Sequence, residues 1–236
     1  MEKISELLGN LNWLTIAVLI FMIFFAVRGH KRGFLLTLFG VVSLVVALLG
    51  SHLISPVITN WVLESEKVVA FYTDKVEEDV DLENETAKEE QAASVAELSL
   101  PEALKNAILQ DNSKSAYSEL GVENFKNYVI YRIAAMMIRA VVYVVTFVIL
   151  FVAVALIIRA MDLIAKLPVL KGANQAAGLL LGVAEGFLLL WIGCIVLTMF
   201  ASKEWAGKAF EMIEQSVILS KIYNNNLLLT AITILF

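Results

Sequence analysis

Hydrophobic residues along the chain gather into four long runs that carry almost no charge. The runs cover residues 11–27, 34–54, 140–158 and 176–200. A helix needs about 20 apolar residues to cross a hydrocarbon layer of about 30 Å. The pattern therefore predicts an all-α integral membrane protein with four transmembrane helices. Pro56 follows the second run and is expected to end that helix, because proline lacks the backbone donor.

Composition changes abruptly between the second and third runs. Residues 55–128 hold 16 Asp and Glu against six Lys and no Arg. Apolar positions in this segment recur at helical spacing, at Val69, Tyr72, Val76 and Val80 and again from Leu100 to Ile108. Ser99 and Glu102 have the spacing of a capping box before the second set. We expect an acidic, helical, extracytoplasmic loop domain.

Four regions follow from these patterns. They are a first transmembrane hairpin (1–54), the acidic loop domain (55–128), a second transmembrane hairpin (129–200) and an amphipathic C-terminal tail (201–236). Between Trp205 and Val217 the tail has one apolar face, so this helix either lies in the membrane interface or packs on the loop domain. The final run, 227–236, is too short to span a membrane.

Basic residues set the expected orientation. Arg28, Lys31 and Arg32 follow the first run, and Gly33 and Phe34 complete the turn to the second. Short loops rich in Lys and Arg stay in the cytoplasm. We therefore expect this turn to be cytoplasmic, together with the turn near Lys166, and both termini to lie outside.

Glycines in the fourth run point to close helix packing. Gly178, Gly182 and Gly186 repeat every four residues and so share one helix face. Membrane helices gain no hydrophobic drive from associating, and small residues let two backbones approach closely. The spacing therefore predicts a groove that receives another helix.

Glu185 is the one charge in the fourth run. It lies seven residues after Gly178, close to two full turns, and so falls on the glycine face. A charge inside a span is costly and is a functional candidate by default. Arg139 is its expected partner. The alternative is that Arg139 extends to the interface while a neutral Glu185 bonds Thr146 or backbone carbonyls.

Catalytic motifs are missing from the sequence. It has no phosphate-cradling glycine loop, no nucleophile elbow and no zinc-binding helix motif. Cys194 is the only cysteine, which excludes a disulfide within the chain and a cysteine-rich metal site. We predict no enzyme activity, no cofactor, no metal site and no nucleic-acid partner.

Two stretches resemble the colicin V production protein family. "LNWLTIAVLI" leading to "RGHKRGFLLTLFGVVSLVVALLGSHLISPVI" resembles its start, where an Arg-Gly-Phe turn joins the first two spans. "LPVLKGANQAAGLLLGVAEGFLLLW" resembles its Leu-Pro turn, here Leu167 and Pro168, and its glycine-rich fourth span. The resemblance implies a multi-pass protein of the bacterial inner membrane, linked to production or export of the peptide toxin colicin V and to envelope maintenance. It implies no catalytic residues.

Two classes of function agree with these features. The favoured one is a non-catalytic accessory or scaffold protein in the lipid bilayer, whose acidic loop binds other envelope or export proteins. The alternative is a small transporter or channel, which the intramembrane charge would serve. Four spans leave little room for a lumen, so transport would require a homo-oligomer.

Overall fold

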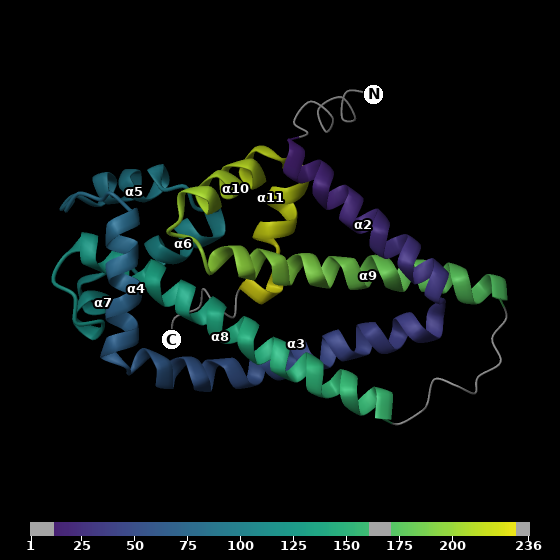
Figure 1. The fold of residues 1–236 in the computed structure, drawn as a ribbon. Helices are drawn as coiled ribbons and strands as arrows, with labels where there is room; N and C mark the ends of the chain where they lie inside the picture. Colours follow the sequence, from purple (N-terminus) through teal and green to yellow (C-terminus); the bar gives the residue numbers. More distant parts are fainter. Residues whose placement is uncertain (1–11, 161–170, 230–236) are drawn as a thin grey trace.

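The fold is described from a computed structural model that covers residues 12–160 and 171–229. All regular structure in these residues is helical (Figure 1). The helices are α2 (Trp13–Arg32), α3 (Phe34–Leu63), α4 (Glu66–Asp79), α5 (Lys88–Glu97), α6 (Glu102–Gln110), α7 (Lys114–Glu119), α8 (Phe125–Ala160), α9 (Lys171–Thr198), α10 (Glu204–Gln215) and α11 (Val217–Asn224). Among them α2, α3, α8 and α9 are long and apolar enough to cross a membrane, which confirms the predicted fold class.

The four long helices pack in a fixed order. Helix α2 packs mainly on α9, while α3 packs on both α8 and α9. In Figure 1, α2 and α9 converge at the end that holds the α2–α3 turn and separate toward the other end. The smaller helices α4–α7, α10 and α11 all gather at that other end. We call the end with the turn the inner end and the opposite one the outer end.

Helix α3 is longer than the sequence predicted. It runs through Pro56 to Leu63, so the expectation that Pro56 ends the second span is wrong. An internal proline removes one backbone hydrogen bond, but neighbouring helices can compensate in a packed bundle. Ser51, Ser55 and Thr59 are buried on both sides of the proline, and α3 keeps its packing on α8. Tertiary packing therefore continues the helix.

Helix α8 belongs to two environments. It begins at Phe125 and has 36 residues, far more than a span needs. Its first half is buried on every side from Tyr128 to Ile130 and from Arg132 to Ala140, whereas large exposed apolar side chains begin at Val145. The outer half of α8 is thus the core of the loop domain, and only its inner half faces lipid.

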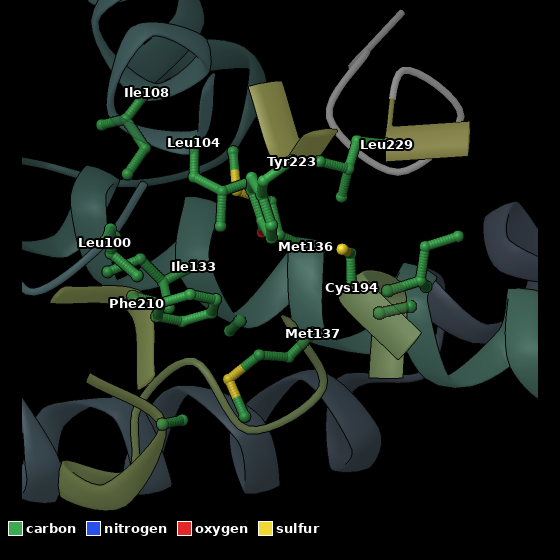
Figure 2. Packing of buried hydrophobic residues seen from close by; sticks show 14 of the residues in the cluster. Leu100, Leu104, Ile108, Ile133, Met136, Met137, Cys194, Phe210, Tyr223 and Leu229 are labelled. Carbon is green, nitrogen blue, oxygen red and sulfur yellow. The ribbon is translucent and has the colours of Figure 1, made fainter. Parts of the chain in front are cut away.

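The loop domain and the tail share one hydrophobic core. Figure 2 shows Ile133 and Met136 of α8 beside Leu104 of α6, with Phe210 and Tyr223 of the tail in the same cluster. Helix α10 buries Ala206, Gly207, Phe210 and Ile213 here. Of the two placements left open for the tail, the structure therefore shows packing on the loop domain.

Capping of α6 also differs from the sequence prediction. Pro101 precedes the helix, and no side chain from its own segment caps it. Ser99 instead donates to Glu211 Oε1 at 3.0 Å, and the Glu102 backbone N–H donates to Glu214 Oε1 at 3.2 Å. Carboxylates are favourable at a helix N-terminus because of its partial positive charge. Helix α10 thus supplies the cap that the local motif was expected to supply.

Candidate functional site

The three predicted glycines of α9 lie against α2. A β-carbon placed on Gly178 would come within 2.6 Å of the Gly33 backbone carbon. One placed on Gly182 would come within 3.0 Å of the Gly29 α-carbon, and both would meet α2 carbonyl oxygens more closely still. At Gly186 the nearest atoms belong to the Phe25 side chain. Two helix backbones are therefore in direct contact at Gly178 and Gly182.

The turn between α2 and α3 is a single glycine. Gly33 has a backbone φ of +80°, a conformation that residues with a side chain rarely adopt. Asn174 of α9 fills the space beside it and accepts the Phe34 backbone N–H at 2.8 Å through Oδ1. The predicted Arg32-Gly33-Phe34 turn is thus bound to the start of α9. Lys31 and Arg32 are exposed beside it.

Glu185 forms an ion pair with Arg28. The Arg28 Nη1 atom lies 3.6 Å from Glu185 Oε1, and the Arg28 guanidinium also stacks over the Phe25 ring at 5.3 Å. Helix side chains point toward the N-terminus of their helix. Because α2 runs from the outer to the inner end, Arg28 extends back into the bundle and reaches Glu185, which is only 6% exposed.

The prediction that Arg139 pairs with Glu185 is wrong. Positions along α3 give the separation between Glu185 and Arg139. Gly40 of α3 lies beside Glu185, whereas the Leu48 carbonyl of α3 accepts from the Tyr143 hydroxyl at 3.5 Å. Eight residues of helix correspond to about 12 Å, and Arg139 lies a further turn outward from Tyr143. The prediction failed because Arg139 lies in the outer half of α8, which belongs to the loop domain.

A cleft of about 330 Å³ opens beside the ion pair. It is lined by the inner halves of α2, α3 and α8 together with Glu185 of α9. Among the described residues, Arg28, Arg32 and Glu185 supply its charges and Ser43 its one hydroxyl, which donates to the Phe39 carbonyl at 2.8 Å. Glu185 Oε2 is buried with no hydrogen-bond partner in the described residues. The cleft therefore holds a buried carboxylate with one oxygen that lacks a hydrogen-bond donor among the described residues, beside the Arg28 guanidinium.

Charged contacts at the outer end join the loop domain to the tail. Asp79, at the end of α4, accepts from Lys203 at 2.7 Å and from Ser202 at 3.0 Å through Oδ2. Desolvation by burial would raise the pKa of Asp79, but these hydrogen bonds and the Lys203 charge outweigh it and hold the pKa below its ordinary value. Within the loop domain, Arg132 of α8 donates to the Ala107 carbonyl of α6. These contacts fix the domain relative to the spans.

Sequence reasoning missed the α2 side of the site. Arg28 was assigned only to the cytoplasmic turn, and Gly29 was not singled out. A signal was present, because Gly29 and Gly33 repeat the four-residue spacing of Gly178 and Gly182 on the facing helix. The predicted Leu167-Pro168 turn lies outside the described residues.

Comparison with known proteins finds a family match that covers the α9 side of the site. Residues 115–226 match the model described as colicin V production protein. The match spans α8, α9 and the tail through α11, and it includes Gly178, Gly182 and Glu185. It leaves the α2–α3 hairpin outside, so the likeness of that hairpin to the family start stays a resemblance. Curated proteins and solved structures gave no match.

Proposed function

We propose that this protein, whose residues 115–226 match the model described as colicin V production protein, is a non-catalytic accessory protein of the bacterial inner membrane. It supports toxin production or export and envelope maintenance by holding partner proteins. One observation carries this proposal: the loop domain is built around the outer half of α8 and shares its core with the tail. A partner bound to the domain is thereby held rigidly relative to the spans.

The exposed carboxylates of α4, α5 and the segment between them are the proposed partner surface. They include Glu77, Glu78, Asp81, Glu83, Glu89, Glu90 and Glu97, with Lys88 as the one exposed cation between Asp81 and Glu97. Opposite charge speeds encounter and selects partners. We expect a basic segment of an envelope or export protein to bind here.

Site-directed crosslinking in cells tests this surface. A photo-reactive residue at position 89 should capture a discrete partner, and the same residue at Leu180, which is 70% exposed on the lipid-facing side, should not. Glu83→Lys with Glu90→Lys should abolish capture from position 89 and lower toxin secretion while membrane levels stay normal. Unchanged capture and secretion would contradict the proposal.

The same proposal places the Arg28–Phe34 turn in the cytoplasm and both termini outside. With Cys194 replaced by alanine, a cysteine at position 84 should react with an impermeant reagent in intact cells. A cysteine at position 30 should react only after the cells are opened. The reverse pattern would invert the topology and would place the acidic domain in the cytoplasm.

The cleft beside Glu185 favours transport as a second candidate function. An open acceptor on a buried carboxylate, reached by a cleft between spans, is an arrangement that proton or cation pathways use. Purified protein in liposomes distinguishes the two functions. Tight liposomes support the accessory role, whereas a proton or cation flux that Glu185→Gln removes supports transport, which would require an oligomer.

A further inference from the structure

A second cavity lies at the outer end of the bundle, away from the Glu185 cleft. There α2 and α9 separate, and α10 and α11 close the wedge between them (Figure 1). The cavity measures about 470 Å³. Binding pockets for small ligands commonly measure about 300–1,000 Å³. Its size is therefore sufficient for a ligand.

Hydrogen bonds fix the tail to the two spans that form the walls of this cavity. Thr15 of α2 bonds Ser216 at 2.9 Å between hydroxyl oxygens, and Thr198 of α9 bonds the Tyr223 hydroxyl at 3.0 Å. The Asn226 side chain donates to the Trp191 carbonyl of α9 at 3.0 Å. The α10–α11 pair is thus fixed to both spans, and the cavity cannot close by a simple shift of the tail.

The lining has the chemistry of a hydrocarbon site. It consists of aliphatic, aromatic and sulfur-bearing side chains, such as Leu14, Leu197, Cys194 and Met212, and none of the described residues that line it is charged. The hydroxyl of Tyr223, its most polar group, is already bonded to Thr198. A polar ligand would lose its hydration here without compensation. The occupant must therefore be apolar where it meets these walls.

The cavity is continuous with the surface of α2 that faces lipid. Trp13, 66% exposed, lies both on its rim and at the start of the exposed apolar face that includes Ile16 and Ile20. Trp205, from α10, is the other exposed tryptophan of the lining. Tryptophan is favoured at the boundary between hydrocarbon and headgroups. The mouth thus lies at the depth where lipid chains begin.

We propose that this cavity binds one acyl chain of a membrane phospholipid, from the leaflet on the side of the loop domain. The chain enters between Trp13 and Trp205, and the headgroup stays at the interface. The bound chain fills the wedge between the two spans and the tail. This inference rests on the membrane location and does not depend on the proposed accessory or transport function.

Two glycines of α9 provide a matched test. Gly193 lines the cavity, and a β-carbon there would meet no atom of the described residues within 4 Å, so Gly193→Leu can fill the space without a clash against their backbone. At Gly172, at the inner end of the same helix, a β-carbon likewise meets no described atom within 4 Å, and Gly172 does not line the cavity. Gly172→Leu is therefore the same change on the same helix without the filling.

The experiment titrates purified protein in detergent with a phospholipid that carries brominated acyl chains. The background is a Trp61→Phe, Trp191→Phe variant, in which Trp13 and Trp205 report quenching by bromine. We expect saturable quenching that non-brominated phospholipid reverses. Gly193→Leu should abolish the saturable part, and Gly172→Leu should leave it unchanged. Ala209→Leu, which fills the cavity from α10, should reproduce the loss.

Other results would overturn the proposal. Quenching that rises linearly with lipid content, equally in all variants, would show contact with bulk lipid only. Saturable quenching that survives both filling variants would place the lipid elsewhere. Saturable quenching seen only after deletion of residues 2–11 would show that the chain's own N-terminal segment is the occupant. Thermal unfolding checks each variant, and Gly193→Leu should raise the lipid-free midpoint because it fills a void.

Discussion

The inner and outer ends of this bundle are stabilised by different kinds of contact. At the inner end α2 and α9 meet through glycines, and the backbones themselves touch at Gly29 and Gly182. At the outer end α8 contributes Tyr128 to a core that also holds Leu104 and Phe210, and all three side chains are almost fully buried. Both ends are rich in apolar residues, but only the outer core is assembled in the way of a water-soluble domain.

The solvent at each end explains the difference. Lipid chains are as apolar as leucine, so the inner helices gain from close van der Waals contact rather than from burial. The loop domain stands beyond the spans, where burying apolar surface contributes about 25 cal/mol per Å². The two regions should therefore respond oppositely to changes in side-chain size: the inner end to additions, the outer end to removals.

The largest effect is expected at Gly182. Gly182→Leu should prevent correct folding, because its side chain would meet the Phe25 carbonyl and the Gly29 backbone. Gly186→Ala should be milder, since the nearest atoms belong to the Phe25 side chain. Leu180→Ala, at a lipid-facing position, is the control. Thermal unfolding and monodispersity in detergent measure all three, and equal tolerance would disprove backbone contact.

Removal of a side chain tests the outer core. Leu104→Ala should lower the free energy of unfolding by about 2–5 kcal/mol, the usual range for a buried leucine. Leu53→Ala, at an α3 position that is 74% exposed to the lipid side, should change it far less. Denaturant titration gives the free energies, and limited proteolysis should show earlier cleavage in the loop domain of Leu104→Ala. Equal losses would mean that the outer core is not a burial-driven unit.

The Arg28–Glu185 pair should give an intermediate effect. Breaking a buried pair from one side costs about 3–5 kcal/mol, but the Arg28 side chain is 33% exposed and solvent reduces the loss. We therefore expect about 1–3 kcal/mol for Arg28→Gln or Glu185→Gln alone, and less than the sum for both. The losses of stability caused by Arg139→Gln and by Glu185→Gln should add when the two substitutions are combined. If the losses of Arg28→Gln and Glu185→Gln simply add in the double variant, the ion pair is contradicted.

The smallest effect is expected at Asp79 and depends on pH. Its folded pKa lies below the ordinary value, so its contribution is complete above an ordinary Asp pKa of about 4. It is lost as pH falls through the lower folded value. Asp79→Asn should cost about 1 kcal/mol or less at neutral pH. The difference in free energy of unfolding between Asp79→Asn and the unsubstituted protein should vanish in acid. Glu204→Gln, which removes an exposed pair with Lys208, is the control, and a pH-independent difference would disprove the titration.

Hydrophobic patterning by itself determined the main features of the fold. Four apolar runs specify four spans because their length is set by the bilayer. Helical spacing within the acidic segment specified α4 and α6, and the repeat of Gly178 and Gly182 specified a packing face. Each of these depends on neighbours in the sequence, which is why it could be predicted.

Only the tertiary structure decided which elements meet, and at what depth. Pro56 continues a helix because α3 stays packed on α8, and Glu214 caps α6 from a segment more than 100 residues away. Arg28, not Arg139, meets Glu185, because the outer half of α8 is held in the loop domain and Arg139 with it. Such pairings depend on helix offsets along the bundle axis. Offsets arise from all the packed surfaces together, and no local pattern in the sequence encodes them.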